Sequence, residues 1–190
     1  MIGIAVGLLY SNASEWLVHK YILHGLGRKK DSFYAFHWHE HHKRARKSAM
    51  RDEDYERSPF GQHAQGKEVF MLAASSAAAA LLIGRKYPWF TATAIYGAWN
   101  YYRCHKRAHL DPEWAREHLP WHYDHHMGPD QDANWCVTSP FFDLLMGTRK
   151  PFVGTEIEAK QKARAAERER ERADRETQKV AQEVENDVAA

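Results

Sequence analysis

The sequence predicts an all-α integral membrane protein with about three apolar spans and a cytoplasmic helical cap rich in histidine. Three observations predict this fold class: three segments almost free of charge, 13 histidines gathered mostly in two windows, and Lys and Arg residues beside the apolar segments. The net charge of only +2 gives no basis for a nucleic-acid partner, because such a partner requires a basic surplus on one face.

The apolar segments cover residues 1–18, 69–84 and 87–102, and the first contains a single charged residue, Glu15. At about 1.5 Å per residue, these segments reach about 24 to 27 Å, slightly less than a hydrocarbon core of roughly 30 Å. They are long enough for a thin or locally thinned bilayer. The alternative is that they are buried helices of a soluble bundle. Aromatic residues at the ends of the third segment favour the membrane.

Three crossings would place every histidine on one side of the membrane. That side would also carry three clusters of Lys and Arg, at residues 28–30, 43–47 and 103–107. The opposite turn carries only Arg85 and Lys86. By the positive-inside rule, the histidine face is predicted to be cytoplasmic.

The chain is expected to divide into a membrane domain over residues 1–152 and a charged tail over residues 153–190. Residues 137–147 are apolar but broken by Pro140, which predicts a re-entrant or interfacial piece. The tail has too little apolar surface to form a core, so it is expected to be a solvated helix or disordered. A partner-binding coiled coil is the alternative, although Val180, Val184 and Val188 do not sustain a heptad.

The histidines occur in four groups with recognisable spacing. In order, these are His19 and His24; His37, His39, His41 and His42; His105 and His109; and His122, His125 and His126. On an α-helix, residues three and four apart share a face, so the last group would project three imidazoles into one space. Neutral imidazole binds borderline divalent metals, which predicts a metal centre.

Several metal motifs are excluded by the residues between the histidines. His39-Glu40 begins a zinc-protease pattern, but Lys43 stands where its second histidine should be. No histidine has Asp or Glu three residues before it, so the Glu-x-x-His pairs of soluble di-iron bundles are absent. A bis-histidine haem would use only two to four of these residues. The histidine count therefore indicates two metal ions, each held by four or five nitrogens.

This histidine framework resembles that of the fatty acid hydroxylase and sterol desaturase superfamily of membrane di-iron enzymes. Residues 134–148, "NWCVTSPFFDLLMGT", resemble the segment that follows the last cluster in that family. The sequence "EWLVHKYILHG" is similar to the first motif of bacterial carotenoid ring hydroxylases. The resemblance covers residues 15–148 and does not include the tail.

The resemblance implies two iron ions, O2 as co-substrate, and hydroxylation or desaturation of an unactivated C–H bond in a fatty acyl chain, sterol or carotenoid. Electrons would come from an external ferredoxin- or cytochrome-type donor with its reductase. No catalytic residue is expected apart from the metal ligands. The expected ligands are His19, His24, His37, His39, His41, His42, His105, His109, His122, His125 and His126.

The middle cluster departs from the family pattern, because Trp38 stands three residues before His41. His37 and His39 are therefore alternative ligands, with His37 favoured. Four polar residues are expected to orient the ligand imidazoles through their other nitrogen: Glu15, Asp124, Asn134 and Asp143. For Asp124, a solvated surface carboxylate is the alternative. His63 and His118 match no motif.

A non-enzymatic alternative remains from the sequence: a histidine-rich membrane protein that binds or transports metal ions. Transport favours polar or ionisable groups within the spans, and for this role the spans offer only Glu15 and Asn100. A haem-binding electron carrier is a third alternative, which the absence of a Soret band would exclude.

Overall fold

The computed structural model describes residues 1–164, 167, 170–171, 173–175 and 178. It divides the chain into two compact units, Met1–Val153 and Gly154–Ala190. The described residues are helical or irregular and contain no strand, which confirms the all-α class. In the second unit, residues 156–164 form a helix with i,i+4 ion pairs such as Lys162–Glu158. The tail valines Val180, Val184 and Val188 lie outside the described residues.

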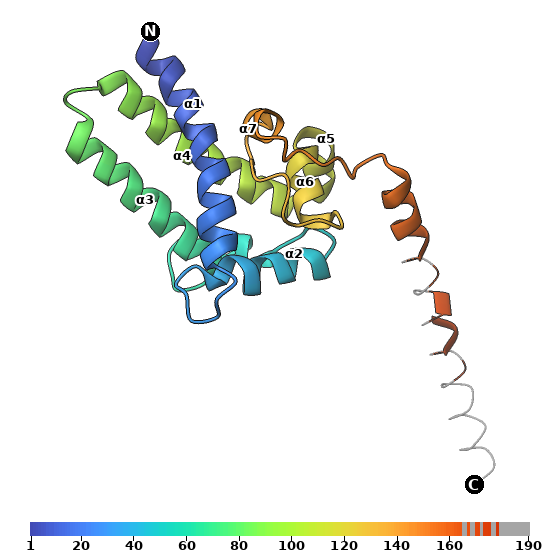
Figure 1. The fold of residues 1–190 in the computed structure, drawn as a ribbon. Helices are drawn as coiled ribbons and strands as arrows, with labels where there is room; N and C mark the ends of the chain where they lie inside the picture. The colour runs from blue at the N-terminus through green and yellow to red at the C-terminus, as the bar shows by residue number, and fades with distance from the viewer. Residues whose placement is uncertain (165–166, 168–169, 172, 176–177, 179–190) are drawn as a thin grey trace. The chain divides into compact units, whose positions relative to one another are not determined.

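The first unit begins with α1 (Ile2–Leu17), which continues without a break into the π-helix η1 (Val18–Leu26). Two longer helices follow later in the chain, α3 (Ala64–Ile83) and α4 (Pro88–Leu110). Of these, α4 packs against α1, and α3 packs against α4 (Figure 1). The remaining elements are short. They lie near those ends of the long helices that are closest to the histidines. They are the π-helix η2 (Phe36–His42), α2 (Lys43–Lys47), the 3-10 helix η3 (Glu53–Glu56), α5 (Pro112–His118), α6 (Pro120–Met127) and α7 (Phe141–Leu145).

The three expected apolar spans coincide with α1, α3 and the first part of α4. Among the described residues, only α3 is both long and apolar enough to cross a membrane. The 16 residues of α1 fall short in length, and α4 has basic residues in its last turns. Large apolar side chains are nevertheless exposed on all three helices. They include Ile4, Leu8, Leu9, Phe70, Leu81, Leu82, Trp89 and Trp99.

Close packing of α1 against α4 depends on small residues. A Cβ added to Gly7 would lie 2.7 Å from the Thr93 Cβ, and one added to Gly97 would lie 2.6 Å from the Ser11 Cβ. The two helix backbones therefore approach where each lacks a side chain, the arrangement by which small residues allow helices to pack closely. This contact fixes the position of α1, which continues into η1, the helix that carries the first two histidines.

Gly7→Ala should lower the free energy of unfolding by about 1 to 3 kcal/mol, because overpacking forces two backbones apart. Gly25→Ala is the matched control, since its added methyl would find only the Lys20 carbonyl oxygen within 4 Å, at 3.5 Å. Thermal unfolding in detergent measures both variants. Equal midpoints for Gly7→Ala and Gly25→Ala would contradict close packing at this position.

Candidate metal centre

Five buried histidines form the first group, which we call the five-histidine group. One ligand nitrogen from each lies within 4.8 Å of the corresponding atoms of the others. The group consists of His19 and His24 from η1, His37 and His42 from η2, and His125 from α6.

The two π-helices explain the spacing within this group. A π-helix closes i→i+5 hydrogen bonds, so that residues five apart lie on one face. His19 and His24 are five apart in η1, and His37 and His42 are five apart in η2. The three- and four-residue spacing of an α-helix does not describe these two segments. In an α-helix, residues five apart would diverge.

Four further buried histidines, called the four-histidine group, lie next to the first group. They are His41 from η2, His105 and His109 from α4, and His126 from α6. The ring of His122 is fully buried beside them, and its Nε2 lies 3.2 Å from Nε2 of His109.

The two groups are adjacent, and two helices contribute residues to both of them. His41 and His42 are consecutive in η2, yet each belongs to a different group, and the same is true of His125 and His126 in α6. The His42 and His126 rings stack with centroids 4.3 Å apart. One turn of η2 and one turn of α6 therefore each contribute a histidine to both groups.

Backbone carbonyl groups fix the orientation of several rings. Nδ1 of His19 donates to the Trp135 carbonyl at 2.6 Å, and Nδ1 of His125 donates to the Ala133 carbonyl at 2.7 Å. In the four-histidine group, Nδ1 of His109 lies 2.7 Å from the Met50 carbonyl. A carbonyl only accepts, so in each neutral ring the proton is on Nδ1 and Nε2 carries a bare lone pair.

The unprotonated Nε2 atoms lie close together, and none of them has a hydrogen to donate to another. Nε2 of His125 lies 3.2 Å from Nε2 of His42, whose own Nδ1 lies 3.0 Å from the Gln131 side-chain oxygen. In the four-histidine group, Nε2 of His41 and Nε2 of His105 have no hydrogen-bond partner among the described residues. Facing lone pairs repel and buried unpartnered nitrogens are costly, whereas a bound cation satisfies both. The donor set therefore fits metal ions.

Two carboxylates that were not predicted from the sequence contact rings of the four-histidine group. Asp52 accepts from Nδ1 of His41 at 2.8 Å, and Glu68 lies 2.6 Å from Nδ1 of His105. The Tyr55 hydroxyl donates to Glu68 at 2.6 Å. Such carboxylates fix the tautomer of a ligand ring and raise its basicity. One feature of the sequence could have indicated Glu68: it lies one residue before an apolar segment.

Burial holds these histidines in the neutral form that binds metal. Loss of solvation lowers the pKa of His19 to about 3 and lowers the pKa of His37, His41 and His42 well below the usual value. The same cause lowers the pKa of His109, His122, His125 and His126.

Metal-free protein should therefore lose stability as the pH falls below about 6.5. The unfolded chain takes up a proton at each histidine near the ordinary pKa of 6.5, whereas the folded chain does not. Stability is thus fully present above that pH, and each such histidine removes about 1.4 kcal/mol per pH unit below it. Denaturant unfolding of chelator-treated protein at pH 8, 6.5 and 5.5 measures the effect, and a flat profile would contradict it.

Two of the expected ligands, His39 and His122, are not members of either group. His39 is partly exposed, and its Nε2 lies 3.0 Å from the Arg28 carbonyl. Of the two alternatives in the middle cluster, His37 lies in the five-histidine group and His39 does not. His63 caps the start of α3, and the ring of His118 stacks on Trp114.

The four polar residues expected to orient imidazoles instead hold the backbone that follows α6. Glu15 accepts from the backbone N–H groups of Val137 and Thr138, and Asp143 accepts from those of Trp135 and Cys136. Asp124 is buried and accepts from the Val153 N–H, and Asn134 accepts from the Lys150 N–H. They act on the rings indirectly, because this segment supplies the carbonyls of Ala133 and Trp135.

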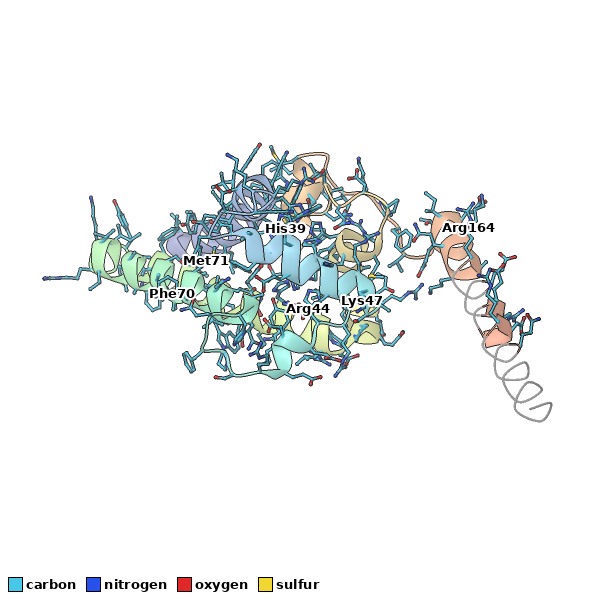
Figure 2. The ribbon with its side chains drawn as sticks, turned by 90° about the horizontal axis from the view of Figure 1, so that it is seen from below. His39, Arg44, Lys47, Phe70, Met71 and Arg164 are labelled. Carbon is cyan, nitrogen blue, oxygen red and sulfur yellow. The ribbon has the colours of Figure 1, made fainter. Side chains whose placement is uncertain are left out.

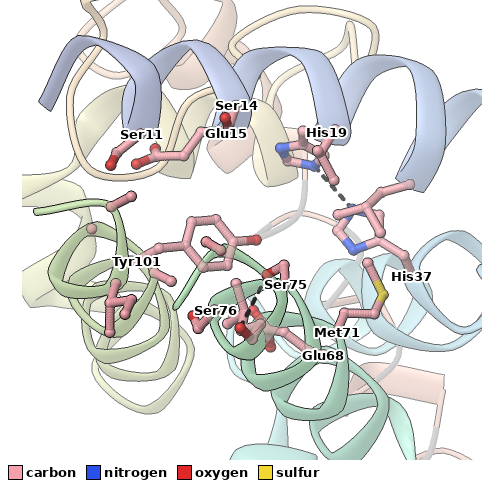
Figure 3. Close-up of a pocket in the computed structure, with 18 of the residues that line it drawn as sticks. Ser11, Ser14, Glu15, His19, His37, Glu68, Met71, Ser75, Ser76 and Tyr101 are labelled. Carbon is pink, nitrogen blue, oxygen red and sulfur yellow. Dashed lines mark hydrogen bonds between the residues drawn. The ribbon is translucent and has the colours of Figure 1, made fainter. Parts of the chain in front are cut away.

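An apolar cavity of about 270 Å³ reaches the metal-binding groups from between α1, α3 and α4. Rings from both groups line it, namely His19, His37 and His41. Figure 3 shows His19 and His37 at one end, with Ser75 and Ser76 of α3 across from α1. Candidate ligand rings from both groups thus form part of the cavity wall.

Comparison with known proteins agrees with the resemblance noted in the sequence. Residues 4–148 match the family model described as fatty acid hydroxylase. No curated protein and no solved structure matched the chain. The family match spans most of the first unit, including both groups of histidines, and confirms the resemblance. The chain belongs to the fatty acid hydroxylase family.

Proposed function

We propose that this protein is a membrane di-iron oxygenase that hydroxylates or desaturates an unactivated C–H bond of a lipid substrate such as a fatty acyl chain, sterol or carotenoid. The observation that carries the proposal is the apolar cavity whose walls include ligand rings of both groups. An apolar cavity with a few convergent polar groups is the usual form of a binding site for an apolar ligand. Family membership supports the reaction class.

The proposed reaction uses O2 and two electrons from an external ferredoxin- or cytochrome-type donor. Hydroxylation converts R–H, O2, two electrons and two protons into R–OH and water. Desaturation removes two hydrogens from adjacent carbons and converts O2 into two waters. Iron held by the two groups would supply the capacity to reduce O2 and break the C–H bond. The five-histidine and four-histidine groups would each hold one ion.

The residues around the cavity would bind the substrate and exclude water. Leu23, Phe36, Met71 and Leu72 provide apolar walls close to the ligand rings. An apolar chain lying along them would present one carbon to His19 and His41, which come from different groups. Fixed orientation of this kind is itself a large contribution to rate.

The exposed apolar surfaces of α1, α3 and α4 support a membrane location. A soluble protein rarely exposes contiguous apolar patches on this scale, and a bilayer would cover them. The histidine end would then face the cytoplasm, on the side that carries most of the Lys and Arg residues. A lipid would enter the cavity from the bilayer between these helices.

Lipid mass spectrometry of cells with and without the protein tests this function. The cells must also supply a working reductase chain, and a His126→Ala variant serves as the inactive control. We expect a lipid that gains one oxygen atom or loses two hydrogens with the wild type alone. Unchanged lipids in cells that hold iron-loaded protein would contradict it, and metal uptake without any new lipid would favour the metal-transport alternative.

Filling the cavity should separate substrate binding from metal binding. Ala98→Phe places a large ring among the cavity walls, and product formation should fall roughly tenfold or more because the substrate is displaced. Bound iron should stay unchanged. Ala92→Phe is the matched control, since Ala92 is exposed on the same helix and does not line the cavity. Full activity of Ala98→Phe would contradict the proposed substrate site.

A further inference from the structure

The helical rod formed by η2 and α2, together with the residues that flank it in the chain, carries a concentration of positive charge. Residues 28–51 contain eight Lys and Arg residues and only two Asp and Glu residues. Figure 2 shows η2 and α2 as one continuous helix across this end of the first unit, with Arg44 and Lys47 along it. The basic face, as defined here, consists of Arg28, Lys29, Lys30, Lys43, Arg46 and Lys47, all of them exposed.

Most of this charge is not neutralised within the protein. Lys29, Lys30, Lys43 and Lys47 make no ion pair with any described residue. Nε2 of His39 lies 3.0 Å from the Arg28 carbonyl, so residues 28–30 lie beside the rod. On the helix, His39, Lys43 and Lys47 follow at four-residue spacing and so lie on one side. Gathering like charges without partners is unfavourable in the isolated protein, and an acidic partner would relieve it.

The basic face is also connected to the candidate ligands, both through the chain and through a hydrogen bond. Lys43 follows His42 in the chain, and His42 follows His41, so that α2 continues from one ligand of each group. The Arg46 guanidinium donates to the carbonyl of His126 at 2.8 Å.

An aromatic side chain, Trp38, also lies between the basic face and the candidate ligands. The Trp38 ring lies 4.9 Å from the His24 ring and 5.4 Å from the His42 ring, measured between centroids. The Arg28 guanidinium covers the same indole, 4.6 Å from its centroid. One partly buried side chain thus separates the basic face from two candidate ligands.

The position of the basic face favours a partner in water over a lipid surface. In Figure 1, α2 lies at the end of the first unit opposite the turn between α3 and α4. The exposed apolar residues of α3 and α4 near that turn include Leu81, Leu82 and Trp89. If these apolar residues lie in the bilayer, the rod lies at the opposite end of the first unit, away from the bilayer.

We infer that the basic face is the docking surface for a small acidic one-electron carrier protein. This inference rests on the proposed function, which requires two electrons for each O2 from an external donor. The carrier would dock twice in each turnover and deliver one electron each time, leaving in its oxidised form. Docking on η2 and α2 would place it next to His41 and His42, one ligand from each group.

Direct binding tests this assignment without depending on turnover. The probe is an acidic plant-type [2Fe–2S] ferredoxin, titrated against iron-loaded full-length protein in uncharged detergent micelles. Lys43→Glu/Lys47→Glu should weaken binding roughly tenfold or more, and wild-type binding should weaken as salt is raised. Arg85→Glu/Lys86→Glu, in the turn between α3 and α4, makes the same change in net charge and should leave binding unchanged.

The outcomes separate this inference from the proposed function. Equal ferredoxin affinity for both variants, salt-independent wild-type binding or the absence of binding would overturn the docking surface. So would Lys43→Glu/Lys47→Glu losing only its binding to phosphatidylserine vesicles, because that result assigns the face to lipid. With a viologen-type reductant in place of ferredoxin, this variant should retain wild-type activity. Failure of iron-loaded wild type to form product with either reductant would count against the proposed function instead.

Discussion

Replacing His41 or His42 with alanine should abolish product formation and remove iron, whereas His39→Ala should leave both unchanged. The three residues are neighbours in η2, but only the first two contribute to the groups of converging nitrogens. Each alanine variant removes one imidazole from a different group. We expect product to fall below detection and bound iron to fall by about one ion per chain, measured by mass spectrometry and metal analysis.

His39→Ala is a close control, because it removes the same side chain from the same helix. Its Nε2 contacts the Arg28 carbonyl at an exposed position, so any cost should be limited to local stability. Loss of iron in His39→Ala, or retention of full iron in His42→Ala, would contradict the assignment of ligands within η2.

Asp143→Ala should destabilise the protein by about 3 kcal/mol or more and release iron from the five-histidine group. Its carboxylate accepts from the backbone N–H groups of Trp135 and Cys136 and from the Thr148 hydroxyl. Removing it leaves buried donors without partners, at about 1 to 3 kcal/mol each. The same loop supplies the Trp135 carbonyl that orients His19, so ring orientation is lost as well.

Thermal unfolding and metal analysis measure the two consequences of this substitution. Asp143→Asn should recover part of the stability, because the amide oxygen still accepts from one donor. Asp31→Ala removes an exposed carboxylate and should have little effect. An Asp143→Ala variant as stable and as iron-rich as Asp31→Ala would show that this loop does not support the metal centre.

Histidine spacing was enough to predict every residue of the two groups, because metal ligands must converge whatever the detailed helix geometry, although it also predicted His39 and His122, which lie outside them. It was not enough to predict how they gather. His19 and His24 lie on one face only because η1 is a π-helix, and neither residue preference nor periodicity distinguishes that turn from an α-helix. The same holds for His37 and His42 in η2, where the i→i+5 geometry places these two residues on one face; His39 lies outside the group.

The groups that orient the rings were the least predictable part of the site. A carboxylate near a histidine in sequence, such as Asp124, is an obvious candidate, yet its partners are Val153 and Arg149. Asp52 and Glu68 orient rings that lie 11 and 37 residues away in sequence. Carbonyl groups orient other rings, and every residue has one, so composition carries no signal for them. Only the tertiary fold decides these contacts.

Isotope-labelled oxygen tests the central claim most directly. Iron-loaded protein, lipid substrate and a working electron donor are supplied with 18O2 in ordinary water. We predict that one O2 is consumed for each product, and that a hydroxylated lipid carries one 18O atom or a desaturated lipid has lost two hydrogens. Product that forms without O2, product labelled from 18O-water instead of 18O2, or iron-loaded protein that leaves the lipid unchanged would contradict the account.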